Sequence, residues 1–538
     1  MINIRVAVES DAPWIREIFE ATYGEDYTYP EFYEEPFLKK LIYSHDTLVL
    51  VAEDDEKGRV VGTASVVLES GAYTDLVGEF GRLAVHPTAW GQGIGGMLLE
   101  ERIRRVEDRL HVGFMEARVT HPFSLTNGPR HGFAPVGFLP LKLRFGGRRE
   151  NTALLVQYFG EALELRRNHP RIIPEAYQLA GVAMDQVGLK RDFIVDEDAP
   201  AYPHGGEYTI QELSAQRYSS LLRIERGRLR KREIFGPLRL HYGFFRLRAG
   251  HSNYLIAWHG DHIAGAIGFT LDECEDIVRV FELICVEDQA ARFLLNELES
   301  RCCDEYCMCY MEIDVNAHAP GMQRTLLELG YEPAAYVPAL AFHRVERLDV
   351  LKMARLLIPC EKGPMTLVPP VEDLAELILR GFQRQEMLPR IGELLERAGL
   401  FAGLTEEQVQ RLAAVCSHAS FEPGERIFAQ NSDRSETYII LDGEVTVEVD
   451  GFDRPVGGVG PGECLGEVAL LTDNRHSATA VSSILVQAAV LERNDLIELV
   501  RQRPDIGVVL YRNLARGLGE KLRRADLNQV GEQSEVEL

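Results

Sequence analysis

The sequence predicts an α+β protein in which two mixed-sheet domains stand in tandem, followed by a helical connector and a C-terminal β-roll of the jelly-roll type. Three observations predict this architecture. The chain of 538 residues is too long for one hydrophobic core. A strand-turn-helix pattern near residue 80 recurs near residue 281. From residue 398 onward, short strands with Gly and Asp turns replace the alternation of strands and helices, which is typical of an all-β fold.

The first domain is expected over residues 1–160, where short strands and helices alternate. Amphipathic spacing predicts helices near 11–22 and 95–109. The segment 161–205 has weaker periodicity and contains DEDAPAYPHGG, so it is expected to be a linker. Apolar runs predict strands at 47–53, 60–68, 78–85, 112–119 and 154–159.

Residues 206–345 repeat the plan of the first domain. YLIAWHGDHIAGAIGF (254–269) matches the earlier strand-turn-strand LVLVAEDDEKGRVVGTASVV, and LGYEPAAYVPALAF (329–342) matches HGFAPVGFLPLKL (131–143). FELICVEDQAARFLLNEL (281–298) matches the strand-to-helix segment at 80–101, but its glycines are lost. Residues 346–397 are expected to form a helical connector, including RLDVLKMARLL as a helix. The β-roll is expected over 398–525, preceded by a helix with Thr405 as its N-cap.

Composition and charge argue against several functions. A formal net charge of −25 disfavours nucleic acid as a partner. The N-terminus lacks the features of a signal peptide and no window approaches 18 apolar residues, so no membrane partner and a cytoplasmic location are expected. Among nine cysteines, a cluster of four lacks the paired spacing of a zinc site, and reduced thiols without a metal are expected. This cluster comprises Cys302, Cys303, Cys307 and Cys309.

A glycine-rich turn joins the strand at 78–85 to the helix that follows, in EFGRLAVHPTAWGQGIGGMLLEE (79–101). Bare backbone at the start of a helix lets N–H groups surround an anion, so the turn suits a phosphate. It is not a P-loop, because no GK[ST] follows. Gly91, Gly93 and Gly96 satisfy GxGxxG, with Glu116 further on, so a dinucleotide fold is an alternative. In that fold, however, the glycines follow the first strand almost directly, whereas here three strands and a helix precede them.

The whole stretch resembles the GNAT acyltransferase superfamily, whose loop reads [R/Q]-x-x-G-x-[G/A] between a strand and a helix. The resemblance covers about 150 residues and includes HGFAPVGF downstream. It implies that acetyl-CoA is the acyl donor and that the preceding strand binds its pantetheine arm through backbone groups. It also implies that a carboxylate four residues before the strand's Leu, Glu79, is the general base; a solvated strand-end residue is the alternative. The implied acetyl-CoA residues are Leu83, Ala84, Val85, Trp90, Gly91, Gln92, Gly93, Ile94, Gly95 and Gly96.

Two residues depart from the superfamily pattern. Trp90 stands where the loop usually begins with Arg or Gln, and Gly128 stands where a Tyr often protonates the leaving thiolate. Candidate replacements for that acid are Ser124, His121 and Tyr73. The acceptor region would be YGEDYTYPEFYEEPF (23–37), whose acidic and aromatic residues suit a cationic amine, although a charged surface loop would have the same composition. The second copy carries Glu287 and Asp288 in place of the glycines and is not expected to bind coenzyme A.

The C-terminal segment GEVALLTDNRHSATA (466–480) resembles the phosphate-binding cassette of cyclic nucleotide-binding domains, roughly GE[LIV]AL…PRxAT. The resemblance spans about 398–520. It implies that Glu467 binds the ribose and that backbone N–H groups of Gly466, Val468 and Ala469 bind the cyclic phosphate of cyclic AMP or cyclic GMP. The family's Pro-Arg falls on Arg475 and His476, so the phosphate-binding Arg is displaced or lost, and retention of the roll as an interaction module is the alternative. The rest of the implied site is Ser477 and Thr479.

Taken together, the two resemblances imply an acetyl-CoA-dependent N-acetyltransferase that acts on an amine and is regulated by its C-terminal domain. Similar fusions favour a protein lysine as the acceptor. The chain is expected to close with a helix at 504–523, and a homodimer formed through this helix is a further expectation. The alternative is a catalytically weak or inactive sensor or scaffold that binds acyl-CoA or a cyclic nucleotide.

Overall fold

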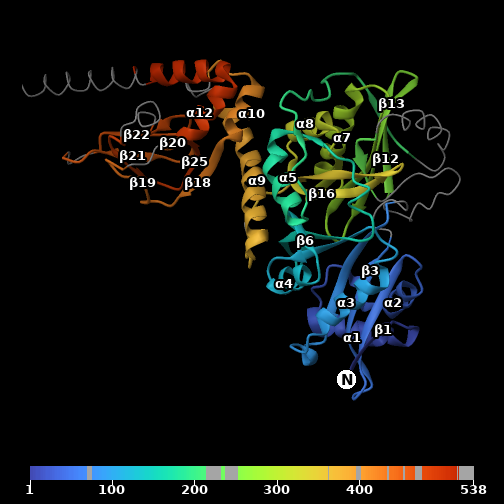
Figure 1. The fold of residues 1–538 in the computed structure, drawn as a ribbon. Helices are drawn as coiled ribbons and strands as arrows, with labels where there is room; N and C mark the ends of the chain where they lie inside the picture. The colour runs from blue at the N-terminus through green and yellow to red at the C-terminus, as the bar shows by residue number, and fades with distance from the viewer. Residues whose placement is uncertain are drawn as a thin grey trace, which may run out of the picture. The chain divides into compact units, whose positions relative to one another are not determined.

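The computed structural model of the chain describes residues 1–68, 75–213, 232–236, 252–361, 363–395, 402–432, 436–451, 455–466, 475–517 and 519. Its contacts divide the chain into two units, Met1–Leu379 and Arg380–Leu538 (Figure 1). The larger unit contains two similar halves, and the smaller unit contains a β-roll. Within the described ranges, no helix is both long and apolar enough to cross a membrane.

The first half of the larger unit is a mixed sheet with helices on both faces. Its strand order is β1-β2-β3-β4-β5-β7-β6, and all pairs are antiparallel except β4 and β5. β2 shows why its sequence is an unbroken apolar run: Val49 and Val51 pack toward α1 and α2, whereas Leu50 and Ala52 pack toward α3. The elements are β1 (Ile2–Val6), α1 (Ala12–Tyr23), α2 (Glu35–Ile42), β2 (Thr47–Asp54), β3 (Arg59–Val67), β4 (Val77–Val85), α3 (Ile94–Val106), β5 (Val112–Arg118), α4 (Pro122–Arg130), β6 (Ala134–Phe145) and β7 (Arg148–Tyr158).

The second half repeats this order of strands. It runs β10-β12-β13-β14-β15-β17-β16, and β14 and β15 form its parallel pair. The predicted tandem repeat is therefore confirmed. Its elements are β10 (Thr209–Glu212), β11 (Ile234–Phe235), β12 (Ser252–His259), β13 (His262–Asp272), β14 (Ile277–Cys285), α7 (Gln289–Asp304), β15 (Tyr310–Asn316), α8 (Pro320–Glu328), β16 (Glu332–His343) and β17 (Glu346–Leu356).

A seam joins the two halves into one continuous sheet. β6 and β16 meet there at Gly137 and Ala335. A Cβ atom on Gly137 would lie 2.2 Å from the Cβ of Ala335, so this position requires glycine because the two backbones approach closely. The helix α5 (Tyr177–Gln186) packs on both β6 and β16 and covers the seam (Figure 1).

Both halves contain the same irregularity beside the seam. Leu141 in β6 and Ala339 in β16 have φ near 50°, and each lies where the strand pairing shifts register. The N–H of Leu141 donates to Asn151, and the N–H of Ala339 donates to Asp349 at the matching position of the second half. A repeated bulge with a repeated side-chain acceptor is independent evidence that the halves are copies of one design.

Two expectations from the sequence are corrected. The segment RLDVLKMARLL is not a helix: Glu346–Leu356 is the strand β17, which completes the second half. It is buried on both faces, so its apolar residues do not alternate as in a half-exposed strand, and the pattern is ambiguous. The expected linker at 161–205 contains α5, whose buried face includes Leu179, Ala183 and Met184.

The smaller unit contains two four-stranded sheets, ordered β18-β25-β20-β23 and β19-β24-β21-β22. This is the predicted β-roll. Thr405 caps α10 as predicted, accepting from the N–H of Gln408. The helix α9 (Pro369–Leu395) contains the boundary between the two units, and residues 504–517 are helical. The remaining elements are α10 (Glu406–Ala414), β18 (Cys416–Phe421), β19 (Arg426–Phe428), β20 (Glu436–Asp442), β21 (Val445–Glu448), β22 (Gly457–Val459), β23 (Cys464–Leu465), β24 (Thr479–Ser482), β25 (Val486–Glu492) and α12 (Arg493–Gln502).

Candidate functional site

The parallel strands β4 and β5 separate partway along their length. They pair over Val77–Glu79, opposite Val112–Phe114. Arg82 then adopts a φ of 55° close to a shift in the register between β4 and β3, and such a bulge bends the strand. Beyond it, Ala84 and Val85 pair with β3 alone. The other backbone edge of β4 therefore faces a cavity, which is where a pantetheine arm is expected to bind.

The turn after β4 has the backbone that an anion site requires. Gly91 and Gly93 have φ values of 79° and 75°, in the left-handed region that side chains rarely adopt. Gly93 is the N-cap of α3, and the first N–H groups of a helix have no intrahelical acceptor. Gly95 lies against Phe123, and Gly96 lies beside α4. The free N–H groups and the positive end of the α3 dipole suit a phosphate.

The side chains of Ile94 and Trp90 in this turn make contacts that the loop motif does not predict. Ile94 packs into the core below the turn, so only its backbone could contact a ligand. Trp90 is 62% exposed, and its Nε1 donates to the carbonyl oxygen of Val85 at 2.7 Å. The indole therefore does not fill the turn, but it occupies one of the β4 carbonyls expected to bind pantetheine. Gln92 is exposed.

Glu79 lies on β4 at the point where the two strands part. Its Oε1 is 3.2 Å from Nη1 of Arg82, and its side chain is 35% exposed. Both residues line a cavity of about 1860 Å³ that also receives the turn residues Gly91, Gly93 and Gly95. A carboxylate at this position can reach the same solvent as the anion turn, as a general base requires.

Position 128, where the superfamily often has the Tyr that protonates the thiolate, has little room for a side chain. Gly128 is buried in α4, where an added Cβ would contact Leu155 and Met115. Ser124 and His121 both line the cavity and stay candidates for the acid. Tyr73, the third candidate, lies outside the described residues.

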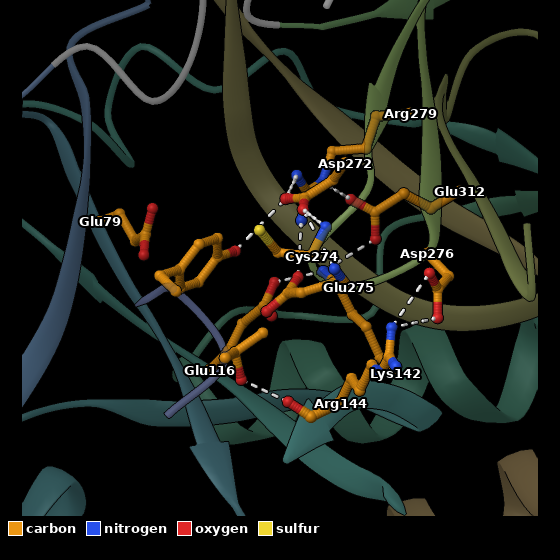
Figure 2. A network of polar contacts seen from close by, with 12 residues as sticks. Glu79, Glu116, Lys142, Arg144, Asp272, Cys274, Glu275, Asp276, Arg279 and Glu312 are labelled. Atoms are coloured by element: carbon orange, nitrogen blue, oxygen red, sulfur yellow. Dashed lines mark hydrogen bonds and ion pairs between the residues drawn. The ribbon is translucent and has the colours of Figure 1, made fainter. Parts of the chain in front are cut away.

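A cluster of charged residues forms the part of the cavity wall opposite Glu79, and it comes largely from the second half (Figure 2). Arg279 on β14 donates to Glu312 on β15 at 2.9 Å, and Asp272 accepts from Tyr29 of the first half at 3.3 Å. Lys142 of β6 pairs with Glu116 and Glu312 at 2.5 and 2.9 Å. Sequence reasoning missed this wall, because no motif marks residues that meet only when the halves join.

Two carboxyl groups of this wall have pKa values shifted in opposite directions. Burial raises the pKa of Glu275 to about 7, and Arg279 only partly offsets that effect. Burial also opposes ionisation of Glu312, but Lys142, Lys352 and Arg279 together hold its pKa well below the usual range. Glu312 therefore stays charged within its ion pairs, whereas Glu275 changes charge near neutral pH.

The equivalent cleft in the second half is occupied by its own chain. β14 pairs with β15 over Ile277–Val280, and β11 then pairs with the free end of β15 at Asp314 and Val315. A Cβ on Gly236, next to β11, would lie 2.3 Å from Cα of Phe281 on β14. The segment thus fills the space where the strands would part, and the matching position of Glu79 carries Arg279.

The turn of the second half carries negative charge instead of bare backbone. Glu287 lies between β14 and α7, where it binds His262 at 2.7 Å and Tyr208 at 2.9 Å. A carboxylate in this place repels phosphate. Both features favour the prediction that the second half does not bind coenzyme A.

The predicted cyclic-nucleotide site is only partly within the described residues. Glu467, Val468 and Ala469 lie outside them. Gly466 has a φ of 79°, and an added Cβ would lie 2.9 Å from Cε1 of His476. The ring of His476 is buried and stacks on Phe428, with ring centroids 3.9 Å apart.

Of the two residues that fall on the family's Pro-Arg, only Arg475 is exposed, because His476 belongs to the interior of the roll. Arg475 is therefore the better candidate for a phosphate ligand. Ser477 is exposed, and the Oγ1 of Thr479 accepts from the N–H of Gln430 at 3.0 Å.

Comparisons with known families agree with this geometry. Residues 45–128 match the family model of the acetyltransferase (GNAT) domain, and residues 418–503 match that of the cyclic nucleotide-binding domain. The chain therefore contains a GNAT acetyltransferase domain and a C-terminal cyclic nucleotide-binding domain, and both predicted resemblances are confirmed.

Two curated relatives each match about a quarter of this chain. One is the cyclic AMP receptor protein of Thermus thermophilus, 32% identical over 131 residues, which are 24% of this chain and 59% of the relative. The other is a CRP-like cAMP-activated global transcriptional regulator of Mycobacterium tuberculosis. It is 29% identical over 139 residues, which are 25% of this chain and 60% of the relative. The chain thus spans about three fifths of the length of these relatives.

Solved structures include neighbours of both folds. The ribosomal-protein-S18-alanine N-acetyltransferase of Escherichia coli is 18% identical, with a TM-score of 0.25 over 30% of this chain and 95% of that one. A cyclic nucleotide-binding domain from Methylobacillus flagellatus is 23% identical, with a TM-score of 0.26 over 27% of this chain and 84% of that one.

Proposed function

We propose that the first half of the larger unit catalyses transfer of an acetyl group from acetyl-CoA to an amine. The observation that carries this proposal is the open backbone edge of β4, which leads directly into the left-handed glycines at the start of α3. In this proposal the turn binds the pyrophosphate, and Leu83, Ala84 and Val85 bind the pantetheine arm. The GNAT domain match over 45–128 supports it.

The chemistry is direct attack of a neutral amine on the thioester carbonyl carbon. Glu79 removes the proton from the ammonium form of the acceptor, directly or through a water molecule. Arg82 holds the Glu79 carboxylate in place through its contact at 3.2 Å. The C–N bond forms and the C–S bond breaks. The attacking nitrogen loses its second proton as the amide forms, and the coenzyme A thiolate gains a proton, so the net transfer runs through Ser124, His121 or solvent.

The test uses the full chain with acetyl-CoA and a pool of amines that includes lysine peptides. Release of free thiol that depends on both substrates, together with a thermal shift on adding coenzyme A, is the expected result. A thermal shift without thiol release from any amine would instead support an inactive acyl-CoA sensor or scaffold. Two observations favour that second candidate, the Trp90 contact to Val85 and the glycine at position 128.

We also propose that the C-terminal domain binds cyclic AMP or cyclic GMP and thereby regulates acetyl transfer. The domain match over 418–503 and the exposed Arg475 support this. Such a ligand shifts the activity only if it binds the active and inactive states with different affinity. The test is the rate of thiol release with and without each nucleotide. An unchanged rate despite a nucleotide-induced thermal shift would show that the domain binds without regulating.

The proposed homodimer through the C-terminal helix rests on exposed apolar residues. Val508 and Tyr511 on the helical segment 504–517 are 68% and 38% exposed. Replacing both residues by Ser should convert the dimer to a monomer in light scattering. A wild-type monomer at micromolar concentration would overturn this part of the proposal.

A further inference from the structure

We propose that the acceptor is a small molecule with at least two protonated amines, and that Glu275 of the second half binds the amine that does not react. This inference rests on the proposed acetyl transfer and names the substrate class of that same site. It follows from three features of the cavity: its shared construction, its charge, and the environment of one buried carboxyl group.

The cavity belongs to both halves of the larger unit. The first half supplies the acetyl-transfer side, with β4, the glycine turn and Glu79. The second half supplies the opposite side, with residues from β14, β15 and β17. The second half does not carry an open coenzyme A cleft of its own. It can therefore act in the reaction only by lining the cavity of the first half.

The wall from the second half is acidic, and two of its four cavity-lining carboxylates, Glu312 and Asp314, already have close cationic partners. Asp272 is 3.7 Å from Arg279 and also accepts from the Tyr29 hydroxyl. Asp314 pairs with Lys352 at 2.6 Å, and Glu312 pairs with Lys142 and Arg279 at 2.9 Å. These pairs hold the wall together and leave little charge for a ligand to satisfy.

Glu275 differs from Glu312 and Asp314, which have close ion pairs, and from Asp272, whose carboxylate accepts from the Tyr29 hydroxyl. It is 7% exposed and lines the cavity, yet within the described residues its carboxylate has one ion pair, to Nη2 of Arg279 at 3.6 Å. Arg279 directs its hydrogen bond to Glu312 instead. The guanidinium of Arg149 binds the backbone carbonyl of Glu275 and not its carboxylate. Figure 2 shows Glu275 beside Asp272 and Arg279, on the side of the cavity away from Glu79. A buried carboxylate with only a long ion pair favours a cationic ligand, which would supply the missing charge-assisted hydrogen bond.

Aromatic residues of the first half complete a site for an extended cation. Tyr23, Tyr27 and Tyr29 line the same cavity, and the faces of such rings attract ammonium groups. A protein lysine carries one ammonium, which would be consumed at Glu79. Its peptide would then cover Glu275 without neutralising it, which is unfavourable for a buried carboxylate. A diamine satisfies both carboxylates at once.

The experiment compares putrescine, cadaverine and spermidine with n-butylamine and a lysine peptide in the thiol-release assay. We expect kcat/KM to be at least about tenfold higher for the diamines than for n-butylamine. Glu275→Gln should raise the KM for putrescine by about tenfold and leave kcat/KM for n-butylamine and the KM for acetyl-CoA within about twofold. Glu273→Gln is the matched control, because Glu273 is exposed and two residues away.

Three outcomes would overturn the inference. They are equal use of putrescine and n-butylamine by the wild type, an equal loss for both amines in Glu275→Gln, or a lysine peptide used better than any diamine. The wild-type comparison stands even if the variant fails to fold. Absence of thiol release with every amine would instead contradict the proposed acetyl transfer itself, so the two failures are distinguishable.

Discussion

The two halves of the larger unit have the same strand order but opposite clefts. In the first half, β4 and β5 part and leave a cavity in front of a glycine turn. In the second half, β11 pairs along β15 where the strands would part, and Glu287 occupies the turn. The same strand order therefore does not by itself produce the same cleft. A short inserted segment and the loss of a few glycines separate a candidate enzyme from a structural partner.

The comparison also shows what the second copy contributes. Its strands provide a charged wall to the cavity of the first, and its seam with the first requires a glycine. The second half, which is not expected to bind coenzyme A, thus lines the cavity of its neighbour. The predictions below test this division of roles, beginning with the largest expected effect.

Removing the proposed base, Glu79 of the first half, should lower the rate of acetyl transfer, whereas a similar change in the second half should not. Glu79→Gln should lower kcat by about 10²- to 10⁴-fold, because the ammonium form of the acceptor then has no general base. The assay is thiol release at saturating acetyl-CoA. Glu282→Gln is the control, because it makes the same chemical change on β14, the corresponding strand of the second half; for it we expect less than a twofold effect. Similar losses in both variants would contradict the assignment of catalysis to the first half.

The carboxyl at the shared wall should make stability depend on pH. The folded protein raises the pKa of Glu275 from 4.5 to about 7. Between these values the folded state holds a proton that the unfolded state has lost, so stability falls as pH rises from about 4.5 to about 7. The loss is at most about 3 kcal/mol. Denaturant titrations at several pH values should show this slope in the wild type and in Glu273→Gln but not in Glu275→Gln. Identical slopes in all three proteins would refute it.

The seam between the halves should not tolerate a side chain. Gly137→Val places a Cβ against the Cβ of Ala335, which is 2.2 Å away, and should cost about 2 kcal/mol of stability. The measurement is the free energy of unfolding from denaturant titration. Gly457→Val is the control, because no atom lies within 4 Å of its added Cβ. An unchanged stability of Gly137→Val would mean that the two halves do not meet as closely as β6 and β16 indicate.

The glycine turn should matter for acetyl-CoA only in the first half. Gly93→Val forces a β-branched residue to a φ of 75° and should weaken acetyl-CoA binding by about tenfold. Calorimetric titration measures the affinity. Gly260→Val is the control: it imposes similar strain at a φ of 57° in the β12–β13 turn of the second half. The affinity of this variant for acetyl-CoA should equal that of the wild type. Equal effects would indicate a general loss of folding instead.

The smallest predicted effect concerns the indole over β4. Trp90→Phe removes the shorter of two side-chain hydrogen bonds to the Val85 carbonyl, the other being from the Thr22 hydroxyl at 3.3 Å. The pantetheine arm then competes with one donor instead of two, so acetyl-CoA should bind about threefold more tightly. Trp258→Phe on β12 is the control in the second half. Weaker binding by Trp90→Phe would show that the indole assists the cofactor and does not compete with it.

Local patterns in the sequence determined much of this protein. The apolar runs predicted the strands β2 to β5, Thr405 predicted the start of α10, and the repeated segments predicted the tandem halves. These features depend on neighbouring residues: the period of burial, a cap and a turn. The glycine turn at 91–96 could also be predicted from the sequence, because the backbone freedom of glycine is a property of the residue itself.

The tertiary structure decided the rest. β17 was misread as a helix because both of its faces are buried in the sheet, which removes the alternation that identifies a strand. Glu275 could not be recognised from the sequence, since its distinction is burial beside Arg279 in a wall that exists only when the halves join. The charge of a carboxyl depends on what surrounds it in space, and residues brought together from distant strands leave no local signal in the chain.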